Sequence, residues 1–336
     1  MKTPIVRITG QSGSDLIPKW KSLLESVTYT DNEGGEADEL EITFVVAPPF
    51  PAPPPEGTRY ALEYGWAEER LRNAGVFTYQ SSGLNKSAGD AWAMTITARS
   101  ADFVEADKSA DLEHYEDTTA GKIFEKLASE GGKSAVVDRE IANIKIPYRL
   151  RLNQSAIGFG QALADEIGGS LKLAGGKWIV TAKSSGRTAT GNVLPTIVIS
   201  PDVVFDAGLT SEGRPKYGTV ATAYFDEDSG TWVEEKTNGK GKTSRTSVLH
   251  PAPSSDEAKV RSKTQATDLA RATVAGSLTI EGDVDAMAGA PLSLPGFGQW
   301  AGNALSAGTI SHTFSFDESG GWLMTVEIAA KENGKD

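Results

Sequence analysis

Short apolar runs alternate with turn residues over the first hundred positions of the chain. Six segments rich in β-branched and aromatic residues follow one another here, separated by Gly, Pro, Asn or Asp. In residues 94–99 the apolar Met94, Ile96 and Ala98 are separated by polar side chains, which is the period of a strand with one buried face. The spacing predicts six strands of a small barrel or sandwich, at residues 5–9, 27–30, 40–46, 60–64, 76–80 and 91–98.

Two connections in this region have a distinct composition. Residues 31–35 read Asp-Asn-Glu-Gly-Gly, and Gly tolerates positive φ while Asp and Asn cap their own backbone, so we expect a hairpin between the second and third strands. Residues 48–55 are mostly proline and lack most backbone donors. They predict an extended spacer at a sheet edge in preference to a ligand for an aromatic groove.

The apolar period changes from two to that of a helix after Asp107. Thr118 and Thr119 precede an apolar stripe that ends at Gly131, which predicts a short capped helix. A second helix is expected over 155–167, a strand over 144–152, and a hairpin over 171–182 that turns at the two glycines 175 and 176. Residues 107–190 are therefore predicted to form a small α+β domain.

Strands resume after Gly191, with one helix among them. Ser254 precedes Glu257 by three residues, which is the capping-box pattern, and the Ala-rich stretch behind it predicts a helix to about Val274. The expected strands are 196–200, 217–225, 230–235, 277–281, 291–294, 307–316 and 322–329. We therefore expect a mainly β chain with an α+β insert: a first β-barrel domain over 1–106, the α+β domain over 107–190, and a second β-barrel domain with a crossover helix over 191–336.

Composition removes several classes of function. The 336 residues carry 33 Lys and Arg against 45 Asp and Glu, so the net charge of −12 opposes binding to nucleic acid and to anionic membranes. There is no Cys, which excludes disulfides, thiolate metal sites and cysteine nucleophiles. The amino terminus has no apolar signal-peptide core, and no apolar stretch is long enough to span a membrane. We expect no membrane partner and no sequence-specific nucleic-acid partner.

Candidate chemistry is sparse. The three histidines, at positions 114, 250 and 312, lie far apart and lack zinc-ligand spacing, so no metal and no cofactor is expected. Gly241-Lys242-Thr243 lacks the preceding glycine of a phosphate-binding loop, since that position is Lys236. The same loop is locally basic, which is typical of a solvated hairpin tip or of a partner contact, through Lys236, Lys240, Lys242 and Arg245.

Two further groups of residues leave other functions open. Adjacent carboxylates, which could serve glycoside hydrolysis but are more often solvated surface pairs, occur at Glu68-Glu69, Asp165-Glu166 and Asp226-Glu227-Asp228. Seven scattered Trp would mark a glycan or partner site if they were exposed together, whereas isolated Trp in strands usually fill a core. A cell-wall hydrolase and a carbohydrate-binding β-sandwich protein are therefore the alternative functions.

Eight short segments occur in a particular order along nearly the whole chain: 27–31 with Gly34, 37–42, 62–65, 75–77, 146–164, 251–274, 278–283 and 294–297. In this order they resemble the phage late control D family, the baseplate hub proteins of contractile tails. The chain departs from the family pattern after Gln154, where residues 155–161 replace the usual Glu-Ser-Asp and Phe-Leu. The positions that match the family signature, with structural roles implied, are Asp31, Gly34, Asp38, Gly65, Tyr148, Gln154, Gly282, Asp283 and Gly296.

The resemblance implies a structural protein and no enzyme. Each subunit would hold two similar tube-type β-barrels, and three subunits would place six barrels in a pseudo-sixfold ring that joins the hexameric tail tube to a trimeric spike. The implied partners are two other copies of the chain, the spike protein, tail tube or tube-initiator proteins, the tape measure protein and the baseplate wedge.

The same resemblance implies a location and a channel. The protein would be assembled in the host cytoplasm and lie in the tail baseplate of a phage virion or a tailocin, with acidic side chains lining the channel. Because the chain ends at Asp336, soon after the second β domain, we expect a separate spike protein, unlike the fused valine-glycine repeat proteins of type VI secretion.

Overall fold

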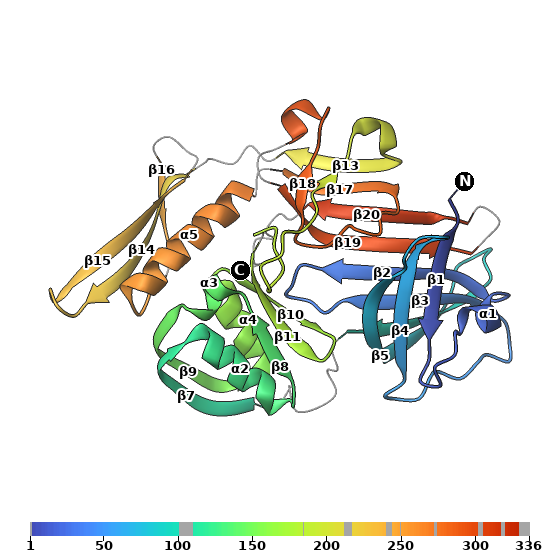
Figure 1. Cartoon of the computed structure of the whole chain (residues 1–336), viewed down its shortest axis with the longest axis horizontal. Helices are drawn as coiled ribbons and strands as arrows, with labels where there is room; N and C mark the ends of the chain where they lie inside the picture. Colours follow the sequence, from blue (N-terminus) through green and yellow to red (C-terminus); the bar gives the residue numbers. More distant parts are fainter. Residues whose placement is uncertain are drawn as a thin grey trace.

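One twelve-stranded sheet dominates the computed structural model, which describes residues 2–100, 110–183, 185–211, 217–239, 244–248, 250–271, 274–301, 305–316 and 320–328 (Figure 1). Its main path runs β1-β4-β5-β6-β3-β2-β19-β20-β17-β13. The first six strands are β1 (Pro4–Thr9), β2 (Leu24–Asn32), β3 (Glu39–Val46), β4 (Arg59–Trp66), β5 (Arg72–Lys86) and β6 (Trp92–Arg99). The others are β12 (Ile197–Val198), β13 (Asp206–Ser211), β17 (Val274–Glu281), β18 (Pro291–Ser293), β19 (Leu305–Ser315) and β20 (Trp322–Ile328).

Strands from the first and the last part of the chain pair with each other in this sheet. β2 pairs antiparallel with β19, so that Tyr29 lies opposite His312 although 283 positions separate them. The first hydrophobic core, built from β1–β6, also contains Phe314 of β19 and Trp322 of β20. We call β1–β6 the first β half, and the strands β12, β13 and β17–β20 the second β half. The halves share both backbone pairing and core side chains.

The α+β unit lies between the two β halves in the sequence and beside the β2–β3 hairpin in space (Figure 1). It contains β7 (Ala110–Thr119), α2 (Ala120–Glu130), β8 (Ser134–Val137), α3 (Arg139–Ala142), β9 (Lys145–Ser155), α4 (Ala156–Glu166), β10 (Gly169–Ala174) and β11 (Lys177–Ala182). Its strands form the sheet β10-β11-β8 and the ribbon β7-β9. Phe124, Leu127 and Trp178 lie in its core. The Ser155 hydroxyl accepts a hydrogen bond from the Gly158 N–H and thereby caps α4.

A third region projects from the opposite side of the α+β unit (Figure 1). β14 (Tyr217–Asp226), β15 (Thr231–Asn238) and β16 (Ser244–Ser247) form a separate sheet, on which α5 (Ser255–Arg271) packs. We call these four elements the α5 unit. The Ser254 hydroxyl accepts from the Glu257 N–H at 3.3 Å, so the predicted cap is confirmed. The helix is shorter than expected, since it ends at Arg271 and Val274 already begins β17.

The expectation of a mainly β chain is confirmed, because strands hold 52% of the described residues and helices 17%. All six strands of the first β half occur where alternation predicted them, and so do the helices at 120–130 and 156–166 and the hairpin of β10 and β11. The pattern missed β7, β8, β13, β16, the short helices α1 (Ile17–Trp20) and α3, and the 3-10 turns η2 (Pro201–Val203) and η3 (Gly298–Ala301). The domain boundaries at 106 and 190 stay a prediction.

Three of the seven Trp are almost fully buried, namely Trp66, Trp178 and Trp322, whereas Trp232 and Trp300 are exposed on different units. Residues 48–55 form no helix or strand and connect β3 to β4, as expected of a spacer. Within the described ranges, no helix combines the length and the apolar character needed to cross a bilayer.

Candidate functional site

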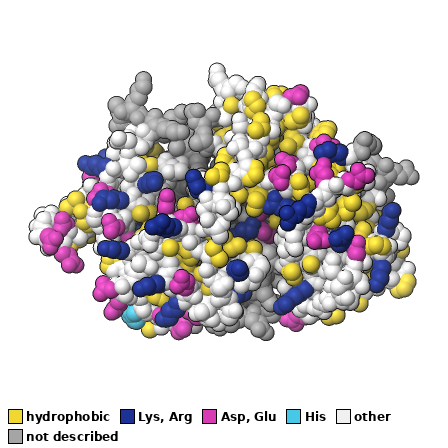
Figure 2. Space-filling model, viewed as in Figure 1, with side chains coloured by type: hydrophobic (Ala, Val, Ile, Leu, Met, Phe, Trp, Pro, Cys, Tyr) yellow, Lys and Arg dark blue, Asp and Glu magenta, His cyan; other side chains and the backbone are white. Residues whose placement is uncertain are grey.

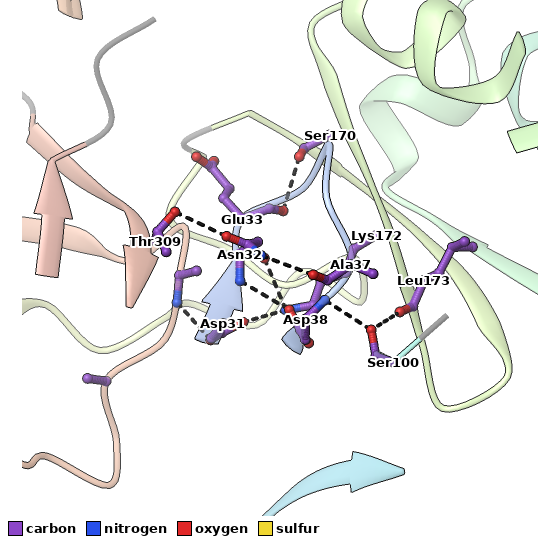
Figure 3. A network of polar contacts seen from close by, with 12 residues as sticks. Asp31, Asn32, Glu33, Ala37, Asp38, Ser100, Ser170, Lys172, Leu173 and Thr309 are labelled. Carbon is purple, nitrogen blue, oxygen red and sulfur yellow. Dashed lines mark hydrogen bonds and ion pairs between the residues drawn. The ribbon is translucent and has the colours of Figure 1, made fainter. Parts of the chain in front are cut away.

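The first β half, the second β half and the α+β unit meet at one buried polar network around the β2–β3 hairpin (Figure 3). Asp31 lies near the end of β2, Asp38 directly precedes β3, and Lys172 lies in β10 of the α+β unit. Lys172 Nζ contacts Asp31 Oδ1 and lies 2.9 Å from Asp38 Oδ1 and 3.1 Å from the Asn32 carbonyl. Both carboxylates are buried, being only 4% and 2% exposed. The cation therefore offsets part of the charge of two carboxylates whose burial would otherwise be costly.

Backbone and hydroxyl groups complete the network. The Asn32 N–H donates to Asp38 Oδ1 at 3.0 Å, and the Ala288 N–H of the second β half donates to Asp31 Oδ2 at 3.0 Å. Thr309 Oγ1 of β19 donates to Asn32 Oδ1 at 3.1 Å. One hairpin thus receives hydrogen bonds from the second β half and an ion pair from the α+β unit, so the network fixes the relative orientation of all three.

The hairpin lies against β10 closely enough to require glycine. A Cβ at Gly34 would lie 1.9 Å from Ser170 Oγ, which itself donates to the Glu33 carbonyl at 3.0 Å. The Gly35 N–H donates to the Leu171 carbonyl at 3.2 Å. Any side chain at position 34 would therefore separate the hairpin from the α+β unit.

The electrostatics of the network follow from burial and from Lys172. The pKa of Asp38 is raised to about 6, because burial, together with the neighbouring Asp31 carboxylate, outweighs the opposing attraction to Lys172. Burial also acts to raise the pKa of Asp31, but attraction to Lys172 and hydrogen bonds from Lys172 and Ala288 outweigh it, so this pKa is lowered. Although burial opposes its charge, Lys172 has a raised pKa because two carboxylates face it. The arrangement stabilises a fixed charge cluster.

A second group of signature positions lies at the seam between the β halves. A Cβ at Gly282 would overlap the Trp322 ring. The centroid of that ring lies 4.8 Å from the centroid of the Trp66 ring, and Trp66 directly follows Gly65 in β4. Asp283 Oδ1 accepts from the Asp285 N–H at 2.9 Å and shapes the turn after β17. Arg72 at the start of β5 donates to the Val284 carbonyl at 2.8 Å, which ties this turn to the first β half.

The remaining signature positions lie elsewhere. The Tyr148 hydroxyl is 2.9 Å from His114 Nδ1 on the exposed face of the β7–β9 ribbon. Gln154 contributes its carbonyl, which accepts from Arg151 Nε at 2.8 Å. Gly296 has a φ of 87° beside Pro201. The structure therefore brings Asp31, Gly34 and Asp38 together at one network, and it links Gly65 to Gly282 and Asp283 only through the Trp66–Trp322 contact, so no single site contains all nine.

Sequence reasoning missed Lys172, Arg72 and His312. His312 lies on the buried face of β19, and its Nδ1 accepts from Trp322 Nε1 at 3.2 Å. Burial lowers the pKa of His312 to about 4, so the ring is neutral at pH 7. Its alternation with Ile310 and Phe314 was a usable signal for burial. Lys172 offered none, since a Lys between two Leu of a strand normally faces water.

The alternative catalytic candidates occupy surface positions. Asp226 caps the β14–β15 turn by accepting from the N–H groups of Asp228 and Ser229. Asp165 pairs with Lys183 at 2.6 Å, and Glu166 pairs with Arg149 and Arg261. Glu69 lies 3.5 Å from Lys2 across exposed surface. These carboxylates serve turns and ion pairs.

Part of the predicted basic loop, Lys240 to Thr243, lies outside the described residues, whereas Lys236 and Arg245 pair with Glu234. Among the described residues, no group of three or more His, Asp or Glu is placed to hold a metal ion.

The fold is that of phage tail proteins. The 43 kDa tail protein of prophage MuSo2 from Shewanella oneidensis superposes with a TM-score of 0.67 over 98% of both chains at 12% identity. A tail protein from Neisseria meningitidis gives a TM-score of 0.66 over 98% of this chain and 97% of that chain, also at 12% identity. An Escherichia coli type VI secretion component gives 0.53 over 92% of this chain and 74% of that chain at 10% identity.

In sequence, the chain is similar to two curated phage proteins, each named "Probable baseplate hub protein". It is 31% identical to that of Escherichia phage P2 over 206 residues, which cover 57% of this chain and 52% of the relative. It is 30% identical to that of Escherichia phage 186 over 189 residues, covering 56% and 48%. The chain thus spans about half the length of these relatives. No family model matches it. The predicted resemblance to baseplate hub proteins is confirmed by these relatives.

Proposed function

We propose that this chain is the baseplate hub of a contractile injection particle, in which three copies form a pseudo-sixfold ring between the tail tube and the spike. The observation that carries the proposal is the identity of 31% to the phage P2 relative named for this role. The tail-protein fold over 98% of the chain supports it. The proposal includes the division into two barrel domains around an α+β domain that the sequence predicted.

The open ends of the twelve-stranded sheet support a ring. β1 pairs with β4 and β13 pairs with β17. Within the described ranges β13 has no strand on its other side, whereas the other edge of β1 is met only near its end, where Thr9 bridges to Asp15 and the Ile8 carbonyl accepts from the Leu16 N–H. An unpaired strand edge is a template for a further strand. Because the two edges differ, an edge-to-edge contact between copies would be heterologous, and heterologous contacts close into rings when the rotation fits.

Apolar side chains gather beside one of these edges. Phe205 is 69% exposed directly before β13, and Val198, Val203 and Trp300 are exposed in the same half of the molecule. Figure 2 shows hydrophobic side chains collected at the top of the view, where β13, β17 and β18 lie in Figure 1. Exposed apolar patches of this kind mark protein contacts. This patch supports a subunit contact at the β13 edge.

The proposed role needs no catalytic residue and no cofactor. Four of the carboxylates considered for catalysis, Glu69, Asp165, Glu166 and Asp226, instead form ion pairs or cap a turn. The proposed partners are the trimeric spike, the tail tube or its initiator, the tape measure protein and the wedge, in the tail baseplate of a phage or tailocin. With a net charge of −12, acidic side chains would line the channel and keep passing DNA from adhering.

The solution mass tests the ring. We expect light scattering to give three times the 35.5 kDa subunit mass, alone or with the spike. Phe205→Asp places a charge in the apolar patch and should leave monomers. Leu112→Asp, at an exposed position on β7, is the matched control and should remain trimeric. A stable dimer that ignores the spike, or a trimer unaffected by Phe205→Asp, would contradict the proposed contact.

A further inference from the structure

The β14–β15 hairpin ends in an exposed aromatic pair. Phe225 and Trp232 lie directly opposite each other in the strand register, with ring centroids 5.5 Å apart at 70°. They are 44% and 63% exposed, which is unusual because aromatic rings of this size normally bury most of their surface. α5 packs against the opposite face, where Thr237 Oγ1 lies 2.8 Å from Ser262 Oγ. Among the described residues, α5 is the helix that packs on this sheet, and it does so on the face away from the aromatic pair.

The same tip carries a concentrated negative charge. Asp226 ends β14, and Glu227 and Asp228, which begin the turn, are exposed. Figure 2 shows acidic side chains at the far left end of the molecule, where Figure 1 places the β14–β15 turn. A protruding element with aromatic rings and carboxylates is suited to fill an apolar pocket that has a cation at its rim.

Such a pocket lies on the same chain at the junction of α3, α4, β11 and α5. Its volume is about 340 Å³, within the range of ~300–1,000 Å³ that holds small ligands or side chains. Its apolar walls are Ile141, Ile144, Ile167 and Val260, and its charged lining residues are Glu140, Lys183 and Lys263. Lys183 is engaged by Asp165, whereas Lys263 makes no ion pair with any described residue.

The tip cannot reach the pocket of its own chain. Ser262, next to Lys263, contacts Thr237 at the base of the hairpin. Thr231 at the tip is six residues further along β15, which at ~3.3 Å per residue is a separation of about 20 Å. The occupant must therefore come from another molecule.

We propose that the hairpin tip of one copy inserts into this pocket of the next copy, with Trp232 against the apolar walls and the turn carboxylates near Lys263. A second copy is the occupant because the chain carries both complementary surfaces. Pairing two tips would bring six carboxylates together, and pairing two pockets would leave both apolar interiors unfilled. Tip-into-pocket contact is heterologous, so it repeats head to tail. The inference rests on the proposed ring and gives it a second, outer contact.

The absence of cysteine allows a direct test. The full chain with Ser229→Cys at the tip and Thr267→Cys at the pocket can form a disulfide only where the two Cα atoms come within about 7 Å. Mild oxidation should then give covalent trimers as the largest species on a denaturing gel. The control combines Ser229→Cys with Ser129→Cys, an exposed serine on α2, and should remain single chains.

The outcomes separate this contact from the ring itself. A protein that is trimeric by light scattering but forms no crosslink between positions 229 and 267 overturns the contact and leaves the ring intact. A ladder extending beyond three chains supports the contact but contradicts a closed trimer. A protein that is monomeric at every concentration and forms no crosslink overturns the contact, while its trimerisation with the spike still tests the ring.

Side-chain variants measure the energetic role of the tip. Trp232→Ala should weaken self-association at least about 30-fold, the size of a hot-spot truncation, whereas Leu112→Ala should not change it. Lys263→Glu should weaken association, and adding Asp228→Lys to it should restore a substantial part. Equal association of all these variants would overturn the proposal.

Discussion

Buried ionic clusters hold the α+β unit on two sides, and they differ in how completely their polar atoms are paired. Toward the first β half, Lys172 is enclosed by Asp31, Asp38 and a backbone carbonyl. Toward the α5 unit, the charges converge on one fully buried carboxylate, Glu257, and on the half-exposed Glu166, with Arg149 and Arg261 as cations. The two clusters are the junctions of the molecule.

The second junction leaves polar atoms unpaired. Glu257 Oε1 and Arg261 Nε are buried and make no hydrogen bond with any described residue. Burial raises the pKa of Glu257, although Arg149 and Arg261 oppose the shift. Each unmade hydrogen bond costs about 1–3 kcal/mol. The comparison indicates that the first junction is a firm anchor and that the second contributes less net stability.

The largest expected effect comes from removing the cation of the first junction. Lys172→Met keeps the length of the side chain but leaves Asp31 and Asp38 buried without the cation that pairs with them. We expect the free energy of unfolding at pH 7 to fall by about 3–5 kcal/mol, measured by urea denaturation with Trp fluorescence. Lys177→Met, on the exposed part of the same hairpin, is the control and should change it by less than about 0.5 kcal/mol. Equal effects would remove the basis for calling this junction an anchor.

The corresponding change in the second junction should cost less. Glu257→Gln preserves the shape of the side chain, and Arg149 and Arg261 keep Glu166 as an ion-pair partner. We expect a loss of about 1–2 kcal/mol in the same measurement. Glu234→Gln, which alters only exposed ion pairs, should change stability by less than about 0.5 kcal/mol. A loss for Glu257→Gln as large as that for Lys172→Met would contradict the ranking.

The sequence could predict the local elements of the structure but not the contacts between residues far apart in the chain, which include the first junction. Local patterns were sufficient for β1–β6, for the hairpin at 31–35 and for the cap at Ser254, because alternation and capping act within a few residues. The expected cap of α2 was wrong, since the Thr119 side chain makes no capping hydrogen bond. The β2–β19 pairing joins residues more than 270 positions apart, and no local pattern specifies it. The signature positions Asp31 and Asp38 were found by resemblance. Lys172, the cation that pairs with them, was not found, because the alternation of β10 assigns it to the face that usually meets water.

The first junction should also respond to pH. The pKa of Asp38 is raised to about 6 in the folded protein, above its ordinary value near 3.8, so the folded state holds an extra proton between these values. Stability contributed by Asp38 therefore falls as pH rises from about 4 to about 6. His312 acts in the opposite sense, because burial lowers its pKa from 6.5 to about 4 and the unfolded state binds the extra proton.

Substitutions at Asp38 and His312 should separate these two opposing dependences of stability on pH. Asp38→Asn should leave the contribution of His312, so that the free energy of unfolding rises with pH between about 4 and 6. His312→Gln should leave the contribution of Asp38, so that the free energy of unfolding falls with pH over the same range. Each slope has an upper bound of about 1.36 kcal/mol per pH unit. Urea denaturation at a series of pH values measures both, and slopes of the same sign in the two variants would contradict the assignments.

The smallest effect concerns the cap of α5, at the edge of the second junction. Ser254 Oγ accepts from the Glu257 N–H at 3.3 Å, a long hydrogen bond, so Ser254→Ala should cost about 0.5–1 kcal/mol. Ser155→Ala, which removes the equivalent 3.1 Å bond of α4, is the matched control and should cost about as much. The cap contacts the backbone of Glu257, whereas the ion pairs use its carboxylate. The effects of Ser254→Ala and Glu257→Gln should therefore add in the double variant, and a coupling above about 0.5 kcal/mol would show that the cap is part of the junction.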